Sequence, residues 1–148
     1  MITANQPVKR LELFEILEQV SRSKSRKEKI ETLKKNNSSA LSDYLRCVFD
    51  DVIQFKLPEG KPPYNPCEEQ HVPSTWHRQN TKLEFLVKNS PKAENLLNLK
   101  RETIFIGILE SVHPKDAEIL VDMINKKTNA KGLTKKLVQE AFPNLIVR

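Results

Sequence analysis

The sequence predicts an all-α fold: a single compact domain of about six to seven helices with a long Pro-rich loop. Apolar residues recur at helical spacing along most of the chain, and the alternating pattern of a β-strand is almost absent. Five of the nine prolines gather in residues 56–75, which must be non-helical. The 148 residues suffice for one core, since a domain of this size buries roughly 68–70% of its unfolded surface.

The first expected helix covers residues 8–21. Leu13, Ile16, Leu17 and Val20 lie at positions i, i+3, i+4 and i+7, which places them on one face of a helix.

Two more helices are expected before the Pro-rich loop. Ser25 and Glu28 have the spacing of a capping box and predict a second helix that ends near Lys35. A third helix, residues 39–55, has the strongest apolar stripe and is expected to lie at the centre of the core. That stripe consists of Leu41, Leu45, Val48, Phe49 and Val52.

The loop at residues 56–75 is expected to run extended over the helices, held by Tyr64 and Trp76. After it, Thr81 and Glu84 repeat the capping-box spacing and predict a fourth helix that stops before Ser90.

A fifth helix is expected over residues 92–112, with Leu97, Ile104 and Ile108 facing inward. Pro114 predicts the start of a sixth helix, because proline favours the first helical position.

The last expected helix begins after Thr134, a residue type that often caps a helix start. Leu133 and Val138 have the spacing of a hydrophobic staple, and Pro143 marks the end.

Composition excludes several classes of protein. No apolar run reaches the roughly 18 residues of a membrane span, and no secretory leader is recognisable, so we expect a cytoplasmic protein with no membrane partner. Cys47 and Cys67 are expected to be free thiols. The three isolated glycines cannot form a phosphate-binding glycine loop, and no cofactor is expected.

Positive charge is concentrated in two segments, residues 22–35 and 126–136. Each has a net charge of +5, so the remainder of this protein of net charge +6 is acidic. Both segments are expected at helix starts, where free backbone N–H groups favour anions and hydroxyls such as those of Ser25 and Thr134 add donors. The candidate phosphate contacts are Arg22, Lys24, Ser25, Arg26, Lys27, Lys29, Lys126, Lys127, Lys131, Thr134, Lys135 and Lys136.

These charges favour duplex DNA bound without sequence preference. The second segment has lysine as its only basic residue type, which suits phosphates better than base edges. Aromatic residues make up 6% of the chain and lie mostly on apolar helix faces, so no stacking platform for single strands is evident.

Residues 113–146 resemble the end of the N-terminal DNA-binding domain of ATP-dependent DNA ligases, especially those of T-even-type bacteriophages. The shared pattern is a helix that opens with acidic residues, a basic helix end, a turn of small residues at 130–134, and a short helix finished by the sequence AFPNLI. The segment SRSKSRKEKIETLKKNN and the helix that follows it are also similar, so the resemblance spans the chain.

This resemblance implies an all-α domain that grips duplex DNA through its phosphates, mainly along the minor groove. It adds Gly132 to the candidate DNA contacts of the second segment. The K-x-D-G sequence that carries the lysine nucleophile of ligases does not occur here, so we expect no catalytic activity.

Other chemistry has weak support in the sequence. Cys67, His71 and His77, with Cys47 more distant, include residue types that bind metals, but they lack the usual paired spacing, and we expect no metal site.

Two hypotheses for the function remain. The first is a non-catalytic protein that binds intact or nicked duplex DNA, as a phage accessory factor in replication, repair or packaging. The second is a phage-encoded interaction module that binds a host or phage protein through the loop 56–75. Either would act in the host cytoplasm.

Overall fold

The computed structural model describes residues 10–146 and confirms the all-α prediction. A 3-10 helix, η2 (Asn80–Phe85), follows α4. Outside the helices, the described residues contain one isolated β-bridge, between Phe55 and Val87. The α-helices are α1 (Leu13–Arg22), α2 (Arg26–Lys35), α3 (Ser39–Phe49), α4 (Trp76–Gln79), α5 (Pro91–Glu94), α6 (Asn98–Ser111), α7 (Pro114–Ile124) and α8 (Lys135–Ala141).

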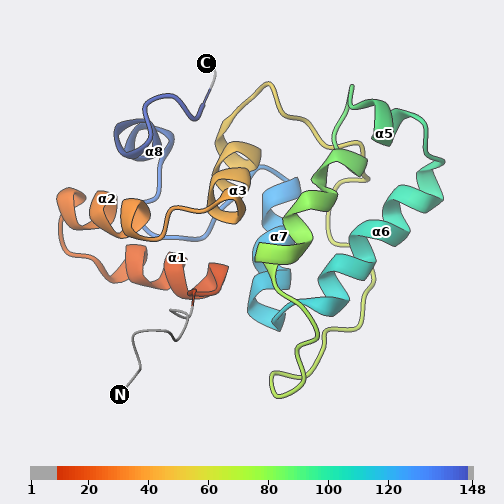
Figure 1. The fold of residues 1–148 in the computed structure, drawn as a ribbon, viewed down its shortest axis with the longest axis horizontal. Helices are drawn as coiled ribbons and strands as arrows, with labels where there is room; N and C mark the ends of the chain where they lie inside the picture. The colour runs from red at the N-terminus through yellow and green to blue at the C-terminus, as the bar shows by residue number, and fades with distance from the viewer. Residues whose placement is uncertain (1–9, 147–148) are drawn as a thin grey trace, which may run out of the picture.

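The helices are arranged from one end of the molecule to the other (Figure 1). Helices α1, α2 and α8 lie together at one end, α5 and α6 lie at the opposite end, and α3 and α7 lie between them. Within the first group, α2 packs against both α1 and α8. This packing brings residues near both ends of the chain into one group of helices.

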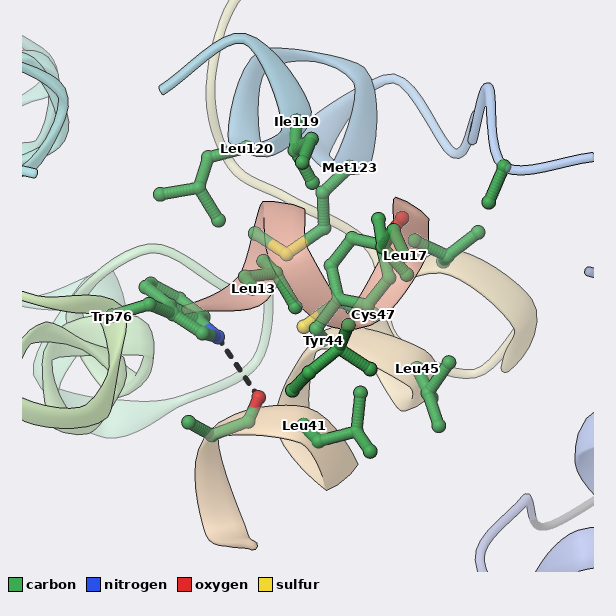
Figure 2. Packing of buried hydrophobic residues seen from close by; sticks show 14 of the residues in the cluster. Leu13, Leu17, Leu41, Tyr44, Leu45, Cys47, Trp76, Ile119, Leu120 and Met123 are labelled. Atoms are coloured by element: carbon green, nitrogen blue, oxygen red, sulfur yellow. Dashed lines mark hydrogen bonds between the residues drawn. The ribbon is translucent and has the colours of Figure 1, made fainter. Parts of the chain in front are cut away.

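The core is centred on α1, α3 and α7, as expected for the strong apolar stripe of α3. Figure 2 shows Leu13 and Leu17 of α1 meeting Tyr44 of α3 and Met123 of α7. Trp76 is buried at the edge of this cluster, where its indole N–H donates to the carbonyl oxygen of Ala40 over 2.9 Å. Trp76 thus holds the end of the Pro-rich loop, as predicted.

The Pro-rich segment 56–75 is extended and fixed along α6 and α7. The backbone N–H of Asn65 donates to Glu110 Oε2 over 2.8 Å, and that of Ser74 donates to the carbonyl oxygen of Ser111 over 2.8 Å. Gly60 N–H donates to Asn125 Oδ1 over 2.9 Å. Tyr64 is half-buried against the core.

Several helices are capped by the residues that the sequence predicted. The hydroxyl of Ser25 accepts from Glu28 N–H, and that of Thr134 accepts from Leu137 N–H, each over 3.2 Å. Leu133 and Val138 are both buried, which agrees with the predicted staple.

Two predicted helices are wrong in extent. The first starts at Leu13, because residues 10–12 are not helical; residues 8 and 9 lie outside the described part. The third ends at Phe49 rather than at residue 55, because Asp50 has extended backbone angles. Val52, which was expected in its apolar stripe, is 73% exposed.

Two further predictions in the second half of the chain are also wrong. The fourth helix begins at Trp76, and Thr81 does not cap it, since its hydroxyl donates to the carbonyl oxygen of Arg78. The predicted helix 92–112 is divided into α5 and α6, and Leu97, expected to face inward, is 81% exposed.

No helix within residues 10–146 is long and apolar enough to cross a lipid bilayer.

Asp116 joins α7 to α1. Its side chain is fully buried, and Oδ1 accepts from the backbone N–H of Phe14 in the first turn of α1 over 2.7 Å. Oδ2 is also buried and has no hydrogen-bond partner among the described residues. Burial raises the pKa of this carboxyl to about 7, with Glu12 and Glu15 acting in the same direction.

This pKa predicts that stability falls as the pH rises towards neutrality. Because the folded protein holds the Asp116 proton more tightly than the unfolded chain, the stabilisation is complete below pH 4 and is lost as the pH rises through 7. When the pH is raised from 5 to 8, we expect the free energy of unfolding of Asp116→Asn to rise by about 2–3 kcal/mol relative to that of the wild type. Thermal unfolding at both pH values measures this change.

The matched control is Asp51→Asn, which alters a carboxylate whose side chain is 90% exposed. Its stability is expected to follow the pH dependence of the wild type. A constant difference between Asp116→Asn and the wild type at both pH values would contradict the assignment.

Candidate nucleic-acid interface

The two basic segments of the sequence meet at the end of the molecule formed by α1, α2 and α8 (Figure 1). The backbone N–H of Lys131 donates to the hydroxyl of Ser21 over 3.0 Å. Arg26 of α2 forms an ion pair with Glu140 of α8, with 2.6 Å between Nε and Oε2. The α1–α2 turn and the segment before α8 therefore form one continuous surface, which we call the basic surface.

Gly132 of the second segment lies against the side chain of Lys29 in the first. Its φ of +81° lies in the left-handed region that favours glycine. A Cβ atom at this position would lie 2.5 Å from Cε of Lys29, so a side chain here would have to displace the lysine stem. Gly132 thus has a structural reason to be glycine, apart from any contact with DNA.

Four lysines supply the unpaired charge of the basic surface. Each is exposed, and none forms an ion pair with another described residue: Lys24, Lys27, Lys131 and Lys136. All four were predicted as phosphate contacts. Lys127, also predicted, is exposed but lines a hollow with Gly60 and Asn125 after α7, so it lies outside the basic surface. Lysine ammonium groups are mobile point charges that suit phosphate oxygens.

Three other predicted cations have carboxylate partners. Arg22 lies 3.9 Å from Glu18, Arg26 contacts Glu140, and Lys135 lies 3.8 Å from Asp51. Because such solvent-exposed pairs are worth only about 0–1 kcal/mol, these side chains can exchange a carboxylate for a phosphate at low cost.

Lys126 points into the protein, unlike its neighbour Lys127. Its ammonium group donates to the carbonyl oxygens of Cys47, Asp50 and Ile53, with distances of 2.9 Å to Asp50 and 2.8 Å to Ile53. These carbonyls lie at and after the end of α3, and desolvation lowers the pKa of Lys126. We therefore assign Lys126 a structural role and leave it out of the basic surface.

Lys29 holds a helix end in a similar way. Its ammonium group donates to the carbonyl oxygens of Val20 and Ser23 at the end of α1, over 3.0 and 2.6 Å. We therefore leave Lys29 out of the basic surface too.

The predicted hydroxyl donors serve as helix caps. Besides the bond from Glu28 N–H to Ser25, the Glu28 carboxylate accepts from Lys24 N–H over 2.8 Å, so the start of α2 already holds an anionic group. Thr134 caps α8. Because both hydroxyls already accept a backbone N–H at a helix start, we assign the phosphate contacts to the lysines around them.

Sequence reasoning did not single out Lys34 and Lys35 as contacts. Both are exposed in the last turn of α2 and have no ion-pair partner among the described residues. Their position within the basic segment 22–35 was the available signal.

A family model matches residues 16–130, from the middle of α1 to the residue before Lys131. It describes a family of unknown function, DUF6433. The chain belongs to the DUF6433 family. No curated protein matches the sequence. The matched region contains the first basic segment, while Lys131–Lys136 and α8 lie outside it.

The cysteines of this DUF6433 protein are placed apart from the basic surface. Cys47 is buried, and burial raises the pKa of its thiol to about 12. Cys67 donates its S–H to the carbonyl oxygen of Val112 over 2.9 Å. Within residues 10–146, no three His, Cys, Asp or Glu side chains are grouped so that they could hold a metal ion.

Proposed function

We propose that this protein binds double-stranded DNA through the phosphate backbone, without reading base sequence. The observation that supports this most is the convergence of two basic segments, about 100 residues apart in sequence, on one end of the fold. Neutralising phosphates releases condensed counterions, and this supplies most of the affinity of sequence-independent binding.

The residue types on the surface favour phosphates over bases. Its unpaired cations are lysines, whereas the two arginines that could read guanine edges, Arg22 and Arg26, have carboxylate partners. All nine aromatic residues lie within residues 10–146, and none of them is exposed. Because binding of single strands relies on exposed aromatic rings, these features favour duplex DNA.

The resemblance to the DNA-binding domain of phage DNA ligases favours the same proposal. The turn before the last helix and the start of that helix, which the resemblance assigns to the DNA backbone, contain Lys131 and Lys136 of the basic surface. We propose a non-catalytic accessory factor of phage replication, repair or packaging that acts in the host cytoplasm, and the missing K-x-D-G sequence supports the non-catalytic part.

A second candidate function is binding of a host or phage protein. The loop 56–75 fits this role less well than expected, because it is fixed along α6 and Trp76 is buried. The observation that favours a protein partner is instead the pair Leu97 and Leu99 at the start of α6, which are 81% and 76% exposed. These residues lie at the end of the molecule opposite the basic surface (Figure 1).

The salt dependence of DNA binding tests the first proposal. We expect the variant Lys27→Ala, Lys131→Ala, Lys136→Ala to bind a duplex of about 30 base pairs more weakly, with a plot of log K against log salt flattened by about 2.7 units. Fluorescence anisotropy at several salt concentrations measures this slope. A nicked duplex of the same sequence, titrated in parallel, reports whether a nick adds affinity.

The matched control removes the same charge elsewhere. Lys82, Lys88 and Lys100 are exposed, have no ion-pair partner among the described residues, and lie outside the basic surface. Their triple alanine variant is expected to keep the wild-type slope. Equal losses in both variants, or no binding by the wild type at about 50 mM salt, would overturn the proposal.

A further inference from the structure

A cleft of about 500 Å³ opens between α1, the end of α2, the start of α3 and α4. Its apolar side is formed by Leu11 and Ile16, and its polar lining includes Arg10, Lys35 and Asn37. This volume lies within the roughly 300–1,000 Å³ typical of small-molecule sites.

Two cations and an amide donor line this cleft, together with His77, whose buried Nδ1 has no hydrogen-bond partner among the described residues. Arg10 and Lys35 have no ion-pair partner among the described residues, and no carboxylate lines the cleft within that part of the chain. The Oδ1 atom of Asn37 accepts a hydrogen bond from the Ser42 hydroxyl, which leaves its amide N–H groups as donors. Two cations and an amide donor set suit an anion with several oxygens.

A second cleft at the same end of the molecule lacks this excess of positive charge. It measures about 340 Å³, and its charged lining consists of Glu18, Glu118, Arg22 and Lys115. Lys115 and Glu18 pair across it with 3.6 Å between Nζ and Oε2. Its charges are thus balanced, and it offers an anion no advantage.

The first cleft continues the basic surface along α2. Lys24 lies just before this helix and Lys27 in its first turn, while Lys34 and Lys35 lie in its last turn, about 11 Å from Lys27 along the axis. Lys35 also lines the cleft. A DNA strand held by the basic surface can therefore follow α2 and terminate at the cleft.

We infer that this cleft binds the phosphate group at the end of a DNA strand, an inference that rests on the proposed function. A terminal phosphate monoester exposes three free oxygens and carries a charge between about −1.5 and −2, since the second pKa of such groups is about 6. It can enter a concave site, whereas an internal phosphodiester has a sugar on both sides and offers two free oxygens. The basic surface binds duplex DNA without sequence preference, and the cleft adds a preference for phosphorylated strand ends.

The test compares short duplexes that differ only at one strand end: 5′-phosphate, 3′-phosphate or hydroxyl. The wild type is expected to bind a phosphate-ended duplex about tenfold more tightly than the hydroxyl-ended one. Lys35→Gln removes a cation of the cleft, and Asn37→Asp places a carboxylate in it. Both variants are expected to reduce the preference to less than about twofold.

The matched control is Lys34→Gln, which removes the neighbouring exposed charge of α2 outside the cleft. It is expected to weaken binding to all three duplexes equally and to retain the end preference. A free nucleoside 5′-monophosphate, added as competitor, is expected to abolish the preference while the duplex stays bound.

The outcomes separate the two proposals. Equal affinity of the wild type for all three ends would overturn the strand-end inference and leave duplex binding intact. Failure to bind any duplex would overturn the proposed function, and a free monophosphate that still bound in a Lys35-dependent manner would then show a nucleotide site in place of a strand-end site.

Discussion

Replacing Arg101 by methionine is expected to destabilise the protein by about 3 kcal/mol and to lower its melting temperature by roughly 10 °C. Arg101 is 2% exposed. Its guanidinium donates to the carbonyl oxygens of Ala93 and Leu96, each over 2.6 Å, to that of Lys56 over 3.2 Å, and to the side chain of Asn98. One side chain thus joins α5, the start of α6 and the strand-like segment after α3.

Methionine retains the apolar stem of Arg101 but none of its donors. Each buried carbonyl left without a partner costs about 1–3 kcal/mol, partly offset because the charged group no longer has to be desolvated. Lys100→Met is the matched control, since Lys100 is the exposed neighbour on the same helix, and it is expected to change stability by less than about 0.5 kcal/mol. Thermal and urea unfolding measure both. Equal melting temperatures for the two variants would refute the role of Arg101.

Lys126→Met is expected to destabilise the protein by about 2–4 kcal/mol without changing the salt dependence of DNA binding. The ammonium group satisfies three backbone carbonyls at and after the C-terminus of α3, where a positive charge also complements the helix dipole. Because this charge lies inside the fold, its removal is expected to release no additional counterions from bound DNA.

Lys127→Met is the control for that variant. Lys127 is exposed beside Gly60 and Asn125, outside the basic surface, so its loss is expected to leave stability within about 0.5 kcal/mol and the slope of log K against log salt unchanged. If Lys126→Met proved as stable as the wild type and bound DNA more weakly, Lys126 would belong to the basic surface after all.

The helices that sequence reasoning placed well are those with both an apolar period and a cap. For α2 and α8, Ser25 and Thr134 mark the first turn and provide the observed cap bonds. Local bonds of this kind depend on residues three or four positions apart, so they can be recognised in the sequence.

The errors arise where distant residues decide the structure. The end of α3 is set in part by Lys126, whose ammonium group binds carbonyls more than 70 residues earlier in the chain. The break between α5 and α6 is stabilised by Arg101, which takes carbonyls that a continuous helix would have used. No local pattern signals either contact.

The candidate site was predictable as a set of charges but not as a surface. The sequence indicates two basic segments, yet it cannot distinguish Lys126 from Lys127 or Lys29 from Lys27, since each pair lies in the same lysine-rich run. Only the fold separates the lysines that hold carbonyls from those that face solvent.

The most direct test of the basic surface is an NMR titration of the ¹⁵N-labelled protein with a duplex of about 15 base pairs at about 50 mM salt. We predict that the backbone amides of residues 21–27 and 130–136 shift together with one binding curve, while those around Leu97 and Leu99 stay unchanged. Shifts confined to Leu97 and Leu99, or to only one of the two basic segments, would contradict a shared DNA-binding surface.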